Sequence, residues 1–208
     1  MKKLRWGVIG AGGIADRRTI PGMMLAENAE LIAVMDINAE QVEKIRQKYG
    51  AKRGYTKEED LLADPEVDAV YIATPIVLHA KQAKLAADYG KDILIEKPLA
   101  MTSDEGQAVI DYCERKGVKI AAGFMMRFGS HVMSMKKAIA EGKIGTVVSG
   151  YSQFTLWLPY EWRTRPPSSC AWKTAHSALC SPTSISRMKP PSGALNFSAR
   201  RAVCWATR

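Results

Sequence analysis

The chain has 208 residues, of which 47% are hydrophobic and 25% charged, a composition typical of a globular protein with a core of its own. Its formal charge of +9 is confined to the C-terminal part, because residues 1–161 hold 22 basic and 21 acidic residues while the segment after Glu161 holds eight basic residues and no acid. That distribution argues against a nucleic-acid-binding protein, and no run of about 18 apolar residues that would cross a membrane is present.

Short apolar segments alternate with helical segments over residues 1–142, and this alternation predicts βαβ units with a parallel sheet, an α/β protein. The expected strands cover residues 4–10, 30–36, 68–73, 92–95 and 118–122. The expected helices cover residues 14–25, 38 onward, 56–64, 77–89, 102–116 and 131–141. Side-chain caps are predicted at the starts of three of these helices, at Asn38, Thr56 and Thr102.

Residues 146–158 change this pattern, because they are rich in β-branched and aromatic side chains and form a longer segment than the earlier strands. We therefore expect the first strand of a different sheet there, after a domain boundary near residues 143–145.

No helical or strand periodicity follows Trp162. Residues 166–208 contain five Pro, eight Ser and no acidic residue. Natural disorder and a frame-shifted translation are both open as interpretations. Trp172, Trp205 and three cysteines are unusual in a disordered segment. If residues 187–190 are translated back into codons and read from the third base of each codon, the second residue of the new reading must be Glu. The frame shift is therefore the favoured interpretation.

The four cysteines of the chain show no spacing typical of a zinc site or a disulfide framework, so we expect free thiols and no metal. Met125, Met126, Met133 and Met135 are interpreted as core-filling residues rather than as a soft-metal site. The first residues lack the long apolar stretch of a signal peptide, and a cytoplasmic location is expected.

The strongest motif is a G-x-G-x-x-A turn at residues 10–15, between the first predicted strand and the first predicted helix. Gly10 allows the tight turn, Gly12 lets the backbone approach a pyrophosphate, and Ala15 lets the helix pack closely on the strand. The helix N-terminus that follows favours an anion. Asp36 ends the next strand, where its carboxylate suits the ribose hydroxyls of NAD and would repel the 2′-phosphate of NADP. We therefore predict NAD as the cofactor, with NADP less favoured.

Two further loops follow predicted strands, at the edge where open α/β sheets bind their ligands. Thr74 and Pro75 end one strand, and His79 stands four residues after Pro75. Glu96 and Lys97 end the next strand, where a lysine can hold a substrate hydroxyl or assist its proton transfer. A satisfied histidine at the start of a helix is an equally open alternative for His79, and a solvated surface lysine is the alternative for Lys97.

Five motifs then occur in a characteristic order: GAGGIA at residues 10–15, Asp36, ATPIVLH at 73–79, EKPLA at 96–100 and GFMMRF at 123–128. Over residues 4–162 the chain therefore resembles the glucose–fructose oxidoreductase/inositol dehydrogenase/MocA family. The resemblance implies an N-terminal Rossmann domain with a doubly wound parallel sheet at residues 1–123. It also implies the start of an α+β domain for substrate and oligomerisation at residues 124–165, truncated here and followed by an aberrant tail at residues 166–208.

The resemblance further implies hydride transfer between the nicotinamide and a carbinol carbon of a sugar, sugar derivative or cyclitol, in a homo-oligomeric protein. By the same resemblance, Lys97 is the catalytic residue that polarises or orients the reacting hydroxyl, and Glu96 lies near the nicotinamide ribose. Arg127 would lie close to the nicotinamide and the substrate, although Met125 stands where the family often has Asn. The residues implied in cofactor binding are Gly10, Ala11, Gly12, Gly13, Ile14, Asp36, Thr74, Pro75, His79, Glu96, Lys97 and Arg127.

One departure from the family pattern concerns catalysis. The family continues with a D-x-G-x-H-x-x-D motif that supplies the proton-transferring His and its supporting acid, and this sequence has no such motif. His176 is the only histidine in the tail. We therefore expect an NAD(P)-dependent oxidoreductase whose turnover is impaired in this chain. The alternative is a non-catalytic dinucleotide-binding module or redox sensor.

Overall fold

The computed structural model of the protein describes residues 3–149. The chain divides into two compact units, Met1–Arg127 and Phe128–Arg208. Within the described residues, the first unit contains the sheet with its covering helices, and the second contains one α-helix.

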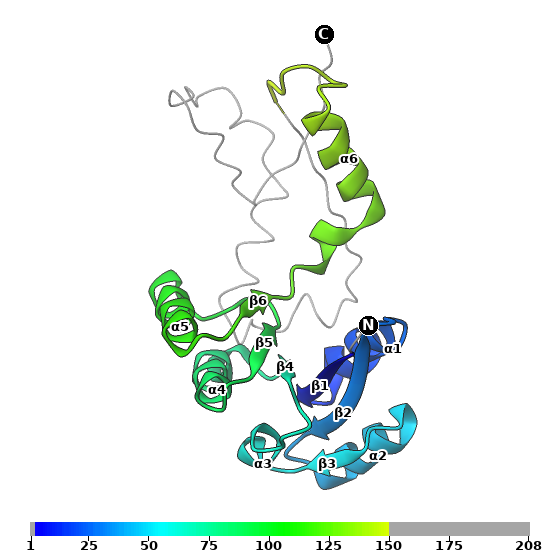
Figure 1. Ribbon diagram of the computed structural model, residues 1–208, viewed down its shortest axis with the longest axis vertical. Coiled ribbons are helices and arrows are strands. Elements are labelled where there is room, and N and C mark those ends of the chain that lie inside the picture. Colours follow the sequence, from blue (N-terminus) through cyan, green and yellow to red (C-terminus); the bar gives the residue numbers. More distant parts are fainter. Residues whose placement is uncertain (1–2, 150–208) are drawn as a thin grey trace, which may run out of the picture. The chain divides into compact units, whose positions relative to one another are not determined.

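A six-stranded sheet forms the centre of the first unit, and its neighbouring strands are all parallel (Figure 1). The strand order is β3-β2-β1-β4-β5-β6, so the chain runs from β1 to one edge and then returns to place β4 on the other side of β1. This is the doubly wound Rossmann arrangement, and the predicted fold class is confirmed for this unit. The strands are β1 (Leu4–Ile9), β2 (Ala29–Met35), β3 (Arg53–Tyr55), β4 (Ala69–Ile72), β5 (Asp92–Ile95) and β6 (Ile120–Ala122).

The edge strand β3 was not predicted from the sequence. It has three residues, Arg53, Gly54 and Tyr55, and none of them is fully buried. A short, charged strand with glycine at its centre carries no hydrophobic alternation, so its pairing with β2 is visible only in the structure.

Helices cover both faces of the sheet. The helices α1 (Ile20–Met24) and α2 (Ala39–Tyr49) contribute buried side chains to one face. The helices α3 (Glu58–Leu62), α4 (Ile76–Asp88) and α5 (Ser103–Lys116) contribute to the other. The sheet is therefore the middle layer of three, as expected for strands joined by helical crossovers.

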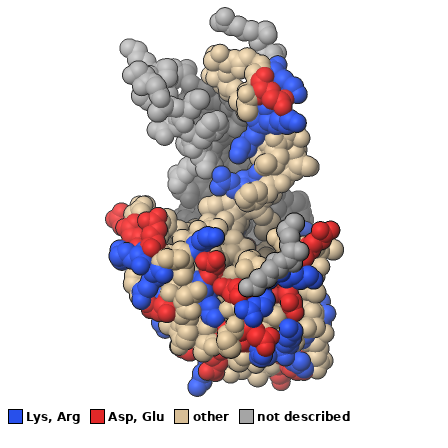
Figure 2. Space-filling model, in the orientation of Figure 1, with Lys and Arg blue, Asp and Glu red and all other residues tan. Residues whose placement is uncertain are grey.

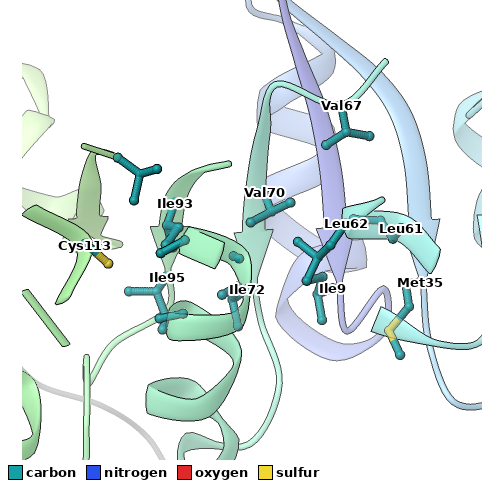
Figure 3. Packing of buried hydrophobic residues seen from close by; sticks show 14 of the residues in the cluster. Ile9, Met35, Leu61, Leu62, Val67, Val70, Ile72, Ile93, Ile95 and Cys113 are labelled. Atoms are coloured by element: carbon teal, nitrogen blue, oxygen red, sulfur yellow. The ribbon is translucent and has the colours of Figure 1, made fainter. Parts of the chain in front are cut away.

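The core follows the alternation of side chains along the strands. Ile9 and Ile72 pack with the helices α3, α4 and α5, whereas Val8 and Tyr71, their neighbours in sequence, pack on the opposite face. Figure 3 shows the first of these clusters, in which Ile9, Val70, Ile72, Ile93 and Ile95 from three neighbouring strands meet Leu61 and Leu62 of α3 and Cys113 of α5. Burial on both faces explains why these strands have almost continuous apolar sequences.

Two of the three predicted helix caps are confirmed. The side chain of Asn38 accepts hydrogen bonds from the backbone N–H groups of Glu40 and Gln41, and Thr102 accepts one from Glu105. The predicted cap at Thr56 is wrong, because α3 begins after Lys57 and no side chain caps it. The first turn of α3 instead carries three acidic residues, whose negative charges are stabilised by the positive end of the helix dipole.

The helix expected at residues 14–25 is not a uniform α-helix. A π-helical turn, η1 (Ala15–Thr19), precedes α1, and the backbone N–H of Ile20 donates to the carbonyl of Ala15, five residues back. Pro21 offers a physical reason, because proline has no N–H to donate and its ring crowds the carbonyl one turn earlier. A wider turn before Pro21 accommodates both effects.

The second unit contains α6 (Ser130–Ala140), and none of its residues is buried. Met133 is 48% exposed and Met125, in the short helix η2 (Met125–Phe128), is 53% exposed, so the interpretation of these residues as core filling is wrong for the part of the chain that the structure describes. No strand forms over residues 146–149, and the rest of the strand expected at 146–158 lies outside the described residues. The tail at residues 166–208 also lies outside them, so the predicted boundaries of the later domains stay predictions.

Asp64 forms the centre of a polar cluster beneath the sheet edge. Its carboxylate is 2% exposed and accepts hydrogen bonds from Arg53 at 2.7 and 2.9 Å, from the Tyr55 hydroxyl at 3.1 Å and from the Glu66 N–H at 2.9 Å. Burial by itself would raise the pKa of Asp64, but the hydrogen bonds from Glu66, Arg53 and Tyr55 outweigh burial and lower the pKa. The folded protein therefore favours the ionised carboxylate.

Asp64→Asn is expected to lower stability near neutral pH and to reduce the loss of stability in acid. Because the pKa of Asp64 is lower in the folded than in the unfolded state, its contribution is present above the ordinary carboxyl range and is lost as pH falls toward the folded-state pKa. Weakening the hydrogen bonds that this buried carboxylate accepts costs about 1–3 kcal/mol. Thermal melts between pH 7 and pH 3 measure both effects. The exposed Glu27 gives the control Glu27→Gln, and equal pH profiles for the two variants would contradict the prediction.

Candidate functional site

The glycine turn lies where the sheet changes winding direction. The strands β1 and β4 are neighbours, but their following helices cover opposite faces, which leaves a crevice beyond their carboxyl ends. The backbone N–H groups of Gly10 and Ala11 both donate to the carbonyl of Met35, at 2.9 and 3.0 Å. The turn after β1 is thereby fixed to the end of β2.

Gly10 is required by the backbone of this crevice. Its φ is +84°, and a Cβ atom at this position would lie 3.0 Å from the carbonyl carbon of Ala73 and 3.0 Å from Cγ2 of Thr74. Both the left-handed conformation and the close approach of the loop after β4 exclude a side chain.

Gly12 and Gly13 face open space instead. A Cβ on Gly12 would come no closer than 3.8 Å to any side chain, with Oδ2 of Asp36 and Nε2 of Gln41 at that distance. A Cβ on Gly13 would meet no atom within 4 Å. No neighbouring atom therefore excludes a Cβ at either position, and only Gly13 favours glycine, through its φ of +51°. The space above them fits a ligand that approaches the backbone closely, as a pyrophosphate does.

Asp36 lies beside this open space, directly after β2. Its Oδ1 atom accepts a hydrogen bond from the backbone N–H of Asn38 at 3.1 Å, and Oδ2 lies toward Gly12. An ionised carboxylate only accepts hydrogen bonds, so this position suits a ligand group with hydroxyl donors.

On the other side of the glycine turn, a cleft of about 250 Å³ opens at the ends of β4 and β5. It brings together five residues that the sequence had proposed, namely Ile14, Thr74, His79, Glu96 and Lys97, with Ala73, Ile76 and Met125 completing the wall. The remaining proposed residues do not line it. Gly10, Gly12 and Asp36 lie toward β2, Pro75 precedes α4, and Arg127 is an exposed residue of η2.

His79 joins the two loops that flank this cleft. Its ring is 1% exposed, with Nδ1 2.9 Å from the carbonyl oxygen of Pro98 and Nε2 2.9 Å from that of Thr74. Each ring nitrogen thus lies at hydrogen-bond distance from a backbone carbonyl oxygen, to which it donates when it carries the proton. This geometry favours the structural alternative for His79, a residue that holds two loops in place.

Lys97 has an exposed side chain at the cleft and lies two residues after the end of β5. The peptide bond between Lys97 and Pro98 is cis, and the Pro98 carbonyl is the one that faces His79. The ammonium group is therefore carried by a loop whose backbone is fixed from below, which is the arrangement that a lysine needs to meet a substrate hydroxyl.

The sequence reasoning did not identify Tyr71, the buried residue beneath the cleft. Its hydroxyl donates to Oε1 of Glu96 at 2.7 Å and accepts a hydrogen bond from Thr19 at 2.9 Å. Burial is the main cause that raises the pKa of Tyr71 well above its usual range, and the contact with Glu96 adds to this effect. The only available signal was a single phenol in an otherwise aliphatic strand, whose hydroxyl must find a partner when buried.

Positive and negative side chains are interspersed on the visible face of the first unit, without a large region of one sign (Figure 2). Among residues 3–149, no group of three or more His, Cys, Asp or Glu is placed to hold a metal ion. Within the same residues, no helix is long and apolar enough to cross a membrane.

Comparison with known proteins gives a family model and many relatives. A model described as an oxidoreductase family with an NAD-binding Rossmann fold matches residues 4–124. The 1,5-anhydro-D-fructose reductase of Ensifer adhaerens is 34% identical over 168 residues, which cover 79% of this chain and 50% of that protein. The D-xylose 1-dehydrogenase (NADP(+)) 2 of Haloferax volcanii is 37% identical over 157 residues, with coverages of 75% and 47%.

A solved structure of a dehydrogenase is also similar to this chain. The WlbA dehydrogenase from Bordetella pertussis, in complex with NADH and UDP-GlcNAcA, has a TM-score of 0.63 and 31% identity, and the match covers 70% of this chain and 42% of that chain. The chain spans about half the length of the curated relatives it matches.

Proposed function

The chain belongs to the oxidoreductase family with an NAD-binding Rossmann fold, and we propose that its first unit binds NAD across the glycine turn. We propose further that the whole protein transfers hydride between NAD and a CH–OH group of a sugar, sugar derivative or cyclitol. The observation that carries this proposal is the arrangement of three features on one edge of the sheet. The open glycine turn lies between Asp36 on one side and the cleft with Glu96 and Lys97 on the other.

In this proposal the pyrophosphate lies over Gly10, Ala11, Gly12, Gly13 and Ile14, where backbone can approach it and where a helix begins. Asp36 accepts hydrogen bonds from the adenosine ribose. Thr74 and Pro75, in the loop after β4, and His79, in α4, lie along the cofactor. Arg127 lies farther along the chain, near the substrate.

The chemistry assigned to the cleft is a hydride transfer coupled to proton movement. Bound NAD would supply the acceptor for the hydride. Lys97 would hold the reacting hydroxyl by a charge-assisted hydrogen bond and stabilise its oxygen as the proton leaves, and Glu96 would orient the neighbouring ribose. The residue that finally takes the proton is not assigned, because the D-x-G-x-H-x-x-D motif of the family is missing from this sequence.

A non-catalytic dinucleotide-binding module is the second candidate, and the missing motif is the observation that favours it. The two candidates share the cofactor site and differ only in turnover. The small-molecule substrate and the homo-oligomeric assembly expected from the family resemblance stay predictions in both cases.

Fluorescence titration of the purified chain with NADH and NADPH tests the shared site. We expect saturable binding of NADH, and a chain that binds neither cofactor would overturn the proposal. Incubation with NAD and a panel of sugars and cyclitols then separates the candidates. Reduction of NAD by one member of the panel supports the oxidoreductase, whereas cofactor binding with no reduction supports the module.

Asp36 is expected to determine the preference for NADH over NADPH. A carboxylate accepts from the ribose hydroxyls of NADH but repels a 2′-phosphate, so Asp36→Ala should shift the ratio of the two dissociation constants toward NADPH by about tenfold or more, roughly 1.4 kcal/mol. Glu40→Gln, an exposed change in the next helix, is the matched control. Tighter binding of NADPH than NADH by the unchanged chain would contradict this role.

A further inference from the structure

A chain of hydrogen bonds with a buried bond at its centre leads to the proposed site, and the proposed function gives no role to two of its members, Thr19 and Tyr71. Thr19, at the end of the π-helical turn, donates to the hydroxyl of Tyr71 on β4. Tyr71 donates to Oε1 of Glu96 at 2.7 Å, and the other oxygen of Glu96 accepts the backbone N–H of Lys97 at 3.1 Å. Three segments that are distant in sequence are therefore joined by contiguous bonds.

The direction of these bonds is determined by their acceptor. The single hydroxyl proton of Tyr71 is donated to Oε1 of Glu96, so the oxygen of Tyr71 can only accept from Thr19. Tyr71 is 1% exposed and Glu96 is 6% exposed, so water has little access to replace either bond. Both oxygens of Glu96 are thus held by partners of the protein itself.

The backbone after β6 limits the remaining freedom of Glu96. Gly123 donates its N–H to the carbonyl of Ile95 at 2.7 Å, and a Cβ on Gly123 would lie 3.5 Å from Oε1 of Glu96. The carboxyl group is therefore enclosed on one side by Gly123 and held on the other by Tyr71. Of the groups around it, the Tyr71 hydroxyl is the side-chain donor that fixes its orientation.

The position of this chain links it to one half of the site. Glu96 and Lys97 line the cleft at the ends of β4 and β5, whereas Asp36 lies on the opposite side of the glycine turn, at the end of β2. A change in Glu96 should therefore affect a ligand group that occupies the cleft and leave a ligand group beside Asp36 unaffected.

We propose that Tyr71 is a positioning residue, which orients the Glu96 carboxylate in the cleft and thereby determines how the nicotinamide half of the cofactor is held. This inference rests on the proposed binding of NAD. Without the hydroxyl, Oε1 of Glu96 loses its buried donor and the carboxylate turns toward another one, which alters the cleft. Thr19 supports the orientation of the phenol from the other end.

The test compares two ligands that share the adenosine half. Tyr71→Phe should raise the dissociation constant for NADH about tenfold, and the emission spectrum of bound NADH should move toward that of the free cofactor. The dissociation constant for ADP, measured by calorimetry, should stay within about twofold of the unchanged chain. Thr19→Val should produce the same pattern with a smaller change.

Tyr112→Phe is the matched control, because the hydroxyl of Tyr112 also donates to a carboxylate at 2.7 Å, that of Asp88, at an exposed position of the same unit. A merely structural role for Tyr71 would weaken ADP and NADH together, in parallel with the melting temperature, and would overturn the inference. Unchanged binding of NADH by Tyr71→Phe would overturn it as well. If the unchanged chain binds ADP but not NADH, or binds neither, the proposed function fails first.

Discussion

Gly12→Val is expected to raise the dissociation constant for NADH by about 100-fold or more while leaving the melting temperature within about 1 °C. A Cβ on Gly12 would lie no closer than 3.8 Å to any atom beyond its chain neighbours, so the fold does not block a side chain at its first carbon. The same space is the one that the pyrophosphate would occupy in the proposed complex. Loss of binding without loss of stability would identify this space as the ligand site.

The measurement is a pair of experiments on one preparation, an NADH titration and a thermal melt. Gly22→Val is a suitable control, since a Cβ at Gly22 also meets no atom within 4 Å but lies within α1. A Gly12→Val protein that binds NADH as tightly as the unchanged chain would show that the cofactor does not approach this turn.

Gly10→Val, unlike Gly12→Val, is expected to lower stability. It should destabilise the first unit by about 3 kcal/mol, or roughly 10 °C in melting temperature. Part of this cost, about 1–2 kcal/mol, arises because a residue with a Cβ must adopt a φ of +84°. The rest arises because the side chain would meet the backbone of Ala73 at 3.0 Å, and Ala73 cannot move aside easily since its N–H donates to the carbonyl of Ile9 in β1.

Gly90→Val separates these two contributions. Gly90 has a φ of +66°, but a Cβ there would meet nothing within 4 Å, so only the conformational cost applies. We expect the Gly90 variant to lose about half as much stability as the Gly10 variant. Equal losses in the two variants would mean that the contact with Ala73 costs nothing.

The central strands of the sheet were predictable because each is a short apolar segment followed by a helical segment. β1, β2, β4 and β5 are apolar on both faces, and each is followed by a helix with its own start and end signals. β3 and the π-helical turn were not predictable, because the first depends on pairing with β2 and the second on how Pro21 is accommodated. Neither of these leaves a periodic pattern in the sequence.

The candidate site also contains residues that the sequence could predict and residues that it could not. The glycine turn and Asp36 have fixed positions relative to the strands that carry them, so a motif was sufficient to place them together. The pair of Tyr71 and Glu96 depends on the register of β4 against β5, in which Ile72 lies opposite Ile95, and on a side chain that crosses between neighbouring strands. The sequence shows a single phenol in an aliphatic strand, but it does not show which residue that phenol contacts.

The position of His79 has a consequence for how the cleft can move. Because one buried ring faces the carbonyls of both Thr74 and Pro98, the loops after β4 and β5 are fastened to the same point on α4. Moving one loop alone would separate its carbonyl oxygen from a buried ring nitrogen that lies 2.9 Å away. We therefore expect the two loops to move together, so that a ligand that contacts either loop affects the position of both.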